Sequence, residues 1–91
     1  MEIKPEKFLP IGSVVTLING TKKLMIFGRF QKQVPPGKIW DYVACLYPEG
    51  NLDEKHNVFF NHFEIDNVFF VGYKDDEEIF TNNLLLQHTN P

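Results

Sequence analysis

The sequence predicts a small α+β domain, made mainly of antiparallel β-strands, with one helix near its C-terminal end. Three observations support this prediction. Two β-branched, apolar runs flank Asn19-Gly20, residues 38–47 alternate in side-chain character, and an acidic run at 75–78 precedes apolar residues near helical spacing. At 91 residues the chain is expected to be one domain, composed of an N-terminal arm at 1–10, a β-sheet body at 11–73 and a helix at 75–88.

The first half of the predicted body is a β-hairpin. Phe8 and Leu9, at the end of the proline-containing arm, are expected to dock onto it. The two runs around Asn19-Gly20 predict strands at 13–18 and 22–31, and Asn-Gly is typical of a type I′ turn, whose two central residues both need positive φ. Gly28 lies inside the second predicted strand, where glycine indicates a β-bulge or a bend that lets a small sheet curl.

The third predicted strand, 38–47, follows a loop at 34–38 in which two prolines lack ladder donors. Its alternation separates two sets of side chains, Trp40, Tyr42, Ala44 and Leu46 on one face and Asp41, Val43, Cys45 and Tyr47 on the other. Both faces are largely apolar. We therefore expect both to be covered, inside a barrel, beneath a helix or at an interface.

The remaining elements are shorter. A short edge strand is predicted at 58–60, one helical turn at 61–66 and a last strand at 67–73. Asp75 and Glu78 have N-cap and N3 spacing for a helix at 76–87, and its apolar residues near helical spacing are Ile79, Phe80, Leu84 and Leu85. Four to five strands in this order predict a strongly bent antiparallel sheet, either an SH3-like barrel or an open sheet that carries the helix.

Charge and composition argue against several classes of function. The formal net charge is −3 and the lysines are scattered, so the sequence lacks the basic stripe on which most nucleic-acid affinity depends. One cysteine cannot form an internal disulfide, and no apolar stretch is long enough for a membrane-spanning helix. The start, MEIKPEKFLPIG, does not have the pattern of a signal peptide. We therefore expect a cytoplasmic protein.

The sequence offers little for catalysis. Cys45, His62 and Asp66 are the one set that could supply a thiol nucleophile, its base and an orienting acid. Cys45 lies mid-strand among apolar residues, so we interpret it as a buried structural residue. The three histidines show no ligand pairing at i,i+4 spacing, and one thiol cannot make a structural zinc site. The sequence therefore predicts a protein that is not an enzyme and needs no cofactor or metal.

Aromatic residues are the main departure from an ordinary composition, with nine phenylalanines, three tyrosines and one tryptophan. Strand neighbours point to opposite faces, so one ring of each of the pairs Phe59/Phe60 and Phe69/Phe70 is expected to face the core. The other rings need the helix, the arm or another protein to cover them. The candidate partner-binding residues are Phe63, Phe69, Tyr73, Trp40 and Tyr42.

Three segments together resemble a known family. LPIGSVVTLINGTKKLMIFGRF, WDYVACLYPEGN and FFNHFEIDNVFFVGY, in that order within positions 9–73, are similar to domain of unknown function family 4176, small proteins encoded beside LXG toxins of the type VII secretion system of Gram-positive bacteria. Phe63 departs from the family pattern, in which an acid is expected in this stretch.

The resemblance implies a non-enzymatic role. Such a protein would be a cytoplasmic chaperone or targeting factor that binds the helical N-terminal LXG domain of a cognate toxin, together with a small helical WXG-like protein. Amphipathic helices dock through apolar side chains, which agrees with the aromatic excess. Two other hypotheses stay open, a small-barrel nucleic-acid-binding module whose rings stack on bases and a thiol-dependent hydrolase. The chain could also self-associate.

Overall fold

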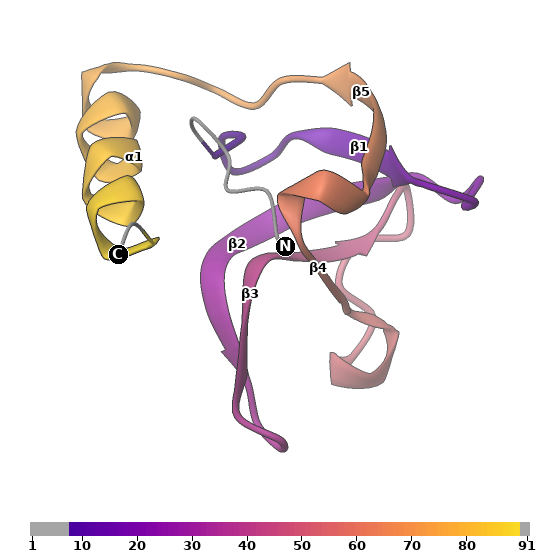
Figure 1. Ribbon diagram of the computed structural model, residues 1–91. Helices are drawn as coiled ribbons and strands as arrows, with labels where there is room; N and C mark the ends of the chain where they lie inside the picture. Colours follow the sequence, from indigo (N-terminus) through magenta and orange to yellow (C-terminus); the bar gives the residue numbers. More distant parts are fainter. Residues whose placement is uncertain (1–7, 90–91) are drawn as a thin grey trace.

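The computed structural model describes residues 8–89, and within that range the chain forms five strands, two 3₁₀ turns and one α-helix (Figure 1). In chain order these are β1 (Val14–Leu17), β2 (Leu24–Gln33), β3 (Lys38–Leu46), the turn η1 (Glu54–His56), β4 (Val58–Phe60), the turn η2 (His62–Glu64), β5 (Ile65–Phe70) and α1 (Asp76–Thr89). The predicted α+β class and element order are confirmed. The last strand begins and ends earlier than predicted, at Ile65 and Phe70.

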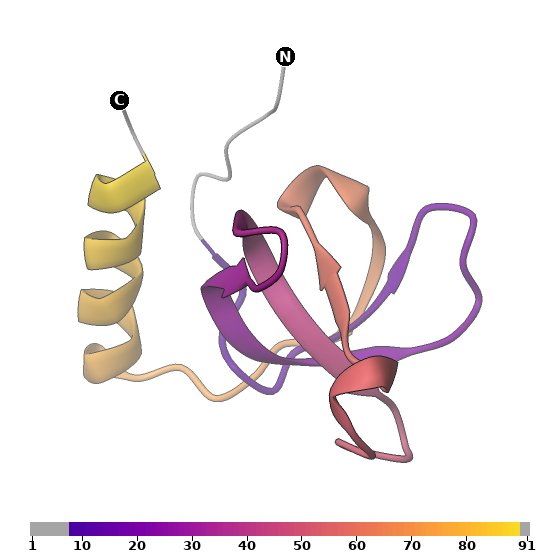
Figure 2. The ribbon, with the colours of Figure 1, turned by 90° about the horizontal axis from the view of Figure 1, so that it is seen from below.

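The five strands form one antiparallel sheet in the order β4-β3-β2-β1-β5. β4 and β5 are its two edges, and within residues 8–89 they form no ladder with each other, so the sheet is open. Helix α1 stands to one side of the sheet, apart from β5 (Figures 1 and 2). Of the two predicted alternatives, the open sheet with a C-terminal helix is therefore the one found.

The turn between β1 and β2 differs from the predicted type I′ hairpin. Asn19 takes a φ of 66°, but Gly20 is not among the glycines with positive φ. The Gly20 N–H donates to the Leu17 carbonyl at 2.9 Å, so Ile18 and Asn19 are the central residues of the turn. The predicted hairpin is therefore confirmed, but the predicted turn type is wrong. A longer loop joins the two strands, and in its turn Asn19 takes a left-handed backbone conformation while Gly20 does not.

The bend predicted at Gly28 is confirmed as a β-bulge. Ile26 pairs with Ala44 and Gly28 with Val43, which leaves Phe27 as the extra residue of β2. A Cβ at position 28 would come within 2.7 Å of Val43 Cγ1. Glycine therefore lets the two longest strands stay close where the sheet curls.

The core is formed by side chains of the sheet together with Phe8, and Leu85 and Leu86 of α1 pack against it. Its buried members are Phe8, Val15, Leu24, Ile26, Tyr42, Ala44 and Phe60. The predicted docking of Phe8 is confirmed. The middle of β3 is buried on both faces, as its two apolar faces predict, since Tyr42, Val43, Ala44 and Cys45 are all covered.

Of the two predictions about the aromatic pairs, one is confirmed and one is wrong. Phe60 is fully buried and Phe59 is partly exposed, so that pair divides between the faces as predicted. Phe69 and Phe70 are both exposed, so the prediction that one of them faces the core is wrong. The register with β1 shifts between Val14 and Val15, where Phe69 is the extra residue. This irregularity breaks the strict alternation on which the prediction depends.

Candidate functional site

The candidate site residues proposed from the sequence do not form one cluster. Tyr73 is 80% exposed and Phe69 is 55% exposed, at or just beyond β5, and Phe63 in η2 is also exposed. Lys23 Nζ lies 5.0 Å from the centre of the Phe69 ring. The structure therefore leaves these three rings accessible, one in η2 between β4 and β5 and two at or beyond β5.

Trp40 is partly covered by its own neighbours. The ammonium of Lys38 lies 3.9 Å from the centre of the Trp40 ring, and the indole Nε1–H donates to Gln33 Oε1 at 3.1 Å. The Phe59 ring centre is 6.5 Å away. Trp40 thus packs against the far end of the β2–β3 hairpin, where only part of its surface could contact another molecule.

Tyr42 belongs to the core, which corrects its nomination as a partner-binding residue. Its side chain is fully buried, stacked on Phe60 with ring centres 5.3 Å apart and met edge-on by Phe8 at 5.7 Å. Burial raises the pKa of the Tyr42 hydroxyl above its ordinary value. The hydroxyl accepts a hydrogen bond from the Leu9 N–H at 3.0 Å and lies 2.7 Å from His62 Nδ1. Tyr42 therefore holds the chain at Leu9 onto the sheet.

The three groups of the hypothetical thiol site have other contacts. Cys45 is buried, with its Sγ 3.7 Å from the Met25 carbonyl oxygen. His62 faces Tyr42, and the exposed Asp66 bonds its neighbour Asn67. Within residues 8–89 no group of three or more histidine, cysteine or acidic side chains is placed to bind a metal ion. The buried position of Cys45 is the one that the structural interpretation predicts.

Helix α1 docks through polar side chains. Arg29 and Glu78 form a two-pronged ion pair, with Nη1 to Oε2 at 2.8 Å and Nη2 to Oε1 at 2.7 Å. Both side chains are almost fully buried. The Asn82 amide bonds both backbone groups of Phe8, accepting from its N–H at 2.9 Å and donating to its carbonyl at 2.6 Å. The helix is thus held to the sheet directly by the ion pair with Arg29 and indirectly through Phe8.

These contacts also fix the charge of Glu78. Burial disfavours the charged carboxylate, but hydrogen bonds from Arg29 and Asn82 outweigh it and hold the pKa of Glu78 below its ordinary value. At the start of the helix, the Asp75 carboxylate accepts from the Glu78 N–H at 2.9 Å, which confirms the predicted N-cap. Glu78 therefore serves the ion pair with Arg29, and Asp75 caps the helix.

The apolar residues of α1 are divided between a covered side and an exposed side. Phe80 is 66% exposed, and Ile79 and Leu84 are also exposed. Leu85 and Leu86 pack against the core. Of the four apolar residues near helical spacing, Leu85 therefore faces the core and the other three are exposed. We call Ile79, Phe80 and Leu84 the outer face of α1.

A signal for this orientation is present in the sequence but easy to miss. Arg29 sits in the otherwise apolar run LMIFGRF and pairs across the ladder with Tyr42, so it points to the core side. A buried arginine needs an acid, and Glu78 with Asn82 one turn later could supply a polar inward face. Nothing in the sequence links Arg29 to a residue 49 positions away.

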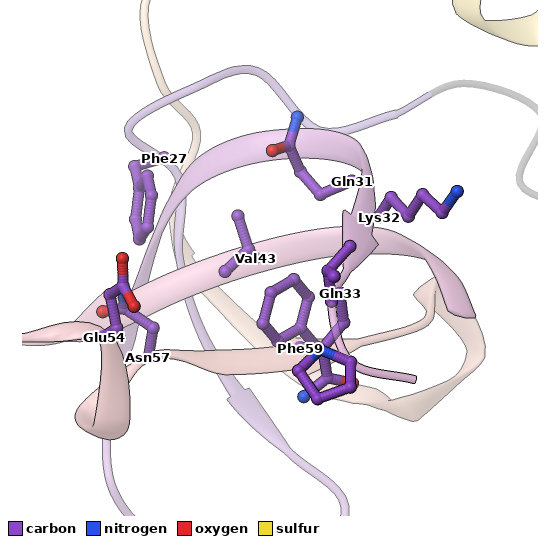
Figure 3. Close-up of a pocket in the computed structure, with 10 residues that line it drawn as sticks. Phe27, Gln31, Lys32, Gln33, Val43, Glu54, Asn57 and Phe59 are labelled. Atoms are coloured by element: carbon purple, nitrogen blue, oxygen red, sulfur yellow. The ribbon is translucent and has the colours of Figure 1, made fainter. Parts of the chain in front are cut away.

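Among the shallow depressions on the described part of the chain, two have aromatic side chains in their lining. In one, Phe27, Val43 and Phe59 point into a space rimmed by polar side chains, among them Gln31, Lys32, Gln33, Glu54 and Asn57 (Figure 3). The other lies beside β5 and is lined by Gly12, Val14, Lys23, Met25, Tyr47, Phe69 and Phe70. Both are apolar at the base and open, which suits contact with another surface better than enclosure of a small molecule.

The hydrogen bond between Tyr42 and His62 predicts a pH dependence of stability. Since the Tyr42 hydroxyl accepts from Leu9, its proton can go to Nδ1 of a neutral His62. Burial lowers the pKa of His62 from its ordinary 6.5, and the Asp41 carboxylate opposes this in part. As pH falls below about 6.5 the unfolded chain therefore takes up a proton first. The free energy of unfolding should decrease there and level off once folded His62 is also protonated.

Urea unfolding at several pH values between about 7.5 and 5 measures this decrease. His62→Gln should remove the part that His62 contributes. His88→Gln, a change near the end of α1 that keeps His62, should retain it. Equal pH slopes for the wild type and His62→Gln would contradict the assignment.

Comparison with known protein families supports the family resemblance seen in the sequence. A family model described as domain of unknown function (DUF4176) matches residues 8–80, which include the whole sheet and the first turn of α1. No curated protein and no solved structure matches the chain. Among residues 8–89, no helix combines the length and apolar character that a membrane span requires. The chain belongs to the DUF4176 family of domains of unknown function.

Proposed function

We propose that this chain is a non-enzymatic accessory protein that binds a helical segment of another protein through the outer face of α1. The resemblance noted above suggests the partner, the helical N-terminal LXG domain of a toxin exported by type VII secretion. Binding would take place in the cytoplasm before export, with a small helical WXG-like protein in the same complex. The chain would then act as a chaperone or targeting factor.

The observation that carries this proposal is that α1 buries two polar side chains and leaves part of its apolar surface exposed. A helix that packs on a domain normally buries its apolar stripe and exposes its polar side. Here the polar residues Glu78 and Asn82 are buried, while Ile79 and Phe80 face outward. A second amphipathic helix could cover them by ordinary ridges-into-grooves packing.

Charge supports a helical partner with basic residues beside its apolar stripe. Asp76 and Glu77 are exposed in the first turn of α1, close along the helix to Ile79 and Phe80, and neither forms an ion pair within residues 8–89. Lysine or arginine on the partner would meet these acids at the edge of the contact. Such charges mainly speed association and select the partner.

Phe63, Phe69 and Tyr73 stay predictions as contacts for the same partner. Phe63 lies in η2, Phe69 in β5 and Tyr73 in the segment between β5 and α1, while α1 itself stands apart from β5 (Figure 1). One helix laid on α1 would therefore rely on Ile79, Phe80 and Leu84 first. This ranking makes the two groups of residues separable by mutation.

Phe80→Ala should weaken binding to the LXG domain about 30-fold, where the domain is that of the toxin encoded beside the gene for this chain. This is the effect of losing about 2 kcal/mol at a central aromatic contact. Isothermal titration calorimetry with the purified domain, and with the WXG-like protein present, measures the loss. Val34→Ala is the matched control, because Val34 is an exposed apolar residue in the loop between β2 and β3.

The control should bind as the wild type does. If the wild-type chain and the LXG domain form no complex even with the WXG-like protein present, the proposed partner is wrong. If Phe69→Ala weakens the complex and Phe80→Ala does not, the partner is right and the outer face of α1 is the wrong surface.

A further inference from the structure

The edge of β5 lacks the features that normally protect an exposed strand. Natural sheet edges are made very short, or carry lysine, proline or inward charges that block pairing with another chain. In β5 the one charged residue is Asp66, near its start. The next four apolar residues, Val68 to Val71, are each between 46% and 60% exposed. This is an unusually open apolar edge.

The opposite edge of the same sheet shows the contrast. β4 has three residues, lies between the two 3₁₀ turns and has Phe60 buried in the core. So short a strand offers little ladder for another chain. β5 and the extended residues after it run on to Gly72, whose N–H is held by Ser13 Oγ at 3.0 Å. The two edges are thus unequal, and β5 is the one that can accept a strand.

The chemistry of this edge specifies its occupant. Backbone donors and acceptors along a strand edge are best satisfied by another strand. The exposed side chains of residues 68–71 are all apolar, so the added strand should be apolar beside them and carry few charges. β5 itself has this composition. We propose that two copies of this chain pair antiparallel through β5 about a two-fold axis, which joins the two open sheets into one.

The charges at the two ends of the segment favour antiparallel self-pairing. With the axis at Phe69 and the register continued past both ends of β5, residue 64 of one copy is opposite residue 74 of the other. Glu64, the last residue of η2, would then lie near Lys74 twice in the dimer. In the same register Asp66 faces Gly72, and the two Asp66 side chains are about 20 Å apart along the strands. Glu64 uses one carboxylate oxygen to accept from the Asn61 N–H. Opposite charges therefore meet and like charges stay apart.

The exposed area is close to what a small dimer needs. Phe69, Phe70 and Tyr73 are 55%, 60% and 80% exposed, which is roughly 400 Å² of ring surface per copy at about 200 Å² for a whole aromatic side chain. Val68 and Val71 add to it. Two copies together approach the total of about 1,000 Å² that separates specific interfaces from chance contacts. We therefore expect a reversible dimer with a micromolar dissociation constant.

Sedimentation velocity of the full chain from about 5 µM to about 1 mM tests the pairing. The wild type should shift from monomer to dimer. Phe70→Lys, a lysine on the exposed edge, should stay monomeric over the same range. Phe80→Lys, which places the same charge on the outer face of α1, should dimerise like the wild type. Near-ultraviolet circular dichroism of Trp40 checks that both variants are folded.

Cross-linking tests the register. Phe69→Cys should form an intermolecular disulfide on mild oxidation at high concentration, because a residue on the two-fold axis faces its own copy. Val34→Cys should react more slowly, and buried Cys45 gives a low background. Faster cross-linking of Val34→Cys would overturn the pairing.

Three outcomes of sedimentation would overturn the proposal. If the wild type stays monomeric at the highest concentration, the strand that pairs with the β5 edge must come from another protein. A dimer lost in Phe80→Lys and kept in Phe70→Lys means that the copies meet through α1. A wild type that grows into larger open-ended species excludes a closed two-fold pair. This inference does not rest on the proposed function, whose first contact is the outer face of α1. Phe69 and Tyr73 would be covered in the dimer, so a partner could contact them only in the monomer.

Discussion

Replacing Glu78 with alanine is expected to lower the free energy of unfolding by about 3–5 kcal/mol, the usual cost of leaving one partner of a buried ion pair alone. The Arg29 and Glu78 side chains are 6% and 10% exposed. Without the carboxylate, the Arg29 guanidinium would keep one hydrogen bond within residues 8–89, from Nη1 to the Leu9 carbonyl at 3.2 Å. The charge would then be buried without compensation.

Removing the Glu78 carboxylate should also weaken contacts outside the ion pair. Glu78 Oε2 also accepts from Asn82 at 3.1 Å, and Asn82 holds both backbone groups of Phe8. Phe8 in turn covers the Tyr42 ring. Helix, residues 8–9 and sheet therefore form one hydrogen-bonded unit, and losing the carboxylate should loosen the helix and the contact at Phe8 together.

Urea unfolding followed by far-ultraviolet circular dichroism measures the effect. Glu77→Ala, one residue earlier and exposed, should cost less than about 0.5 kcal/mol. Arg29→Met combined with Glu78→Leu should recover much of the stability, since well-packed apolar residues can replace a buried ion pair. A loss below about 1 kcal/mol for Glu78→Ala would mean that Arg29 is hydrated in solution rather than buried.

The strands can be predicted from the sequence because their signals are local. Alternation over 38–47, glycine at a bulge and the proline loop at 34–38 each reflect backbone geometry within a few residues. β3 and the bulge at Gly28 accordingly appear where expected. The N-cap at Asp75 is equally local, and it is also found.

The candidate site could be predicted only in part, because exposure depends on distant partners. The outward orientation of Phe80 follows from an ion pair to Arg29 on β2, and the exposure of Phe69 and Phe70 follows from irregular pairing of β5 with β1. The burial of Tyr42 likewise needs Phe8 from the arm. The aromatic excess predicts that some rings stay exposed, but it does not identify which.

Replacing Gly72 with alanine is expected to lower the free energy of unfolding by about 3 kcal/mol, at the upper end for overpacking. A Cβ at this position would come within 2.0 Å of the Ile11 carbonyl oxygen, 2.8 Å of the Ile11 carbonyl carbon and 3.1 Å of the Ser13 nitrogen. All three are backbone atoms, so no side chain can move aside to make room. The residues beyond β5 must separate from residues 11–13, which also breaks the hydrogen bond from Gly72 to Ser13.

A second glycine isolates this steric effect from the ordinary cost of replacing glycine. Gly50 has a φ of 85°, but a Cβ there would meet no atom within 4 Å. Gly50→Ala should therefore cost only the strain of left-handed backbone, about 1–2 kcal/mol. Thermal and urea unfolding compare the two variants. If Gly72→Ala is no more destabilising than Gly50→Ala, the close contact with Ile11 does not hold the end of β5 in place. If the effect is as large as expected, the β5 edge is displaced, and Gly72→Ala should also lose the dimer while keeping the N-cap of α1.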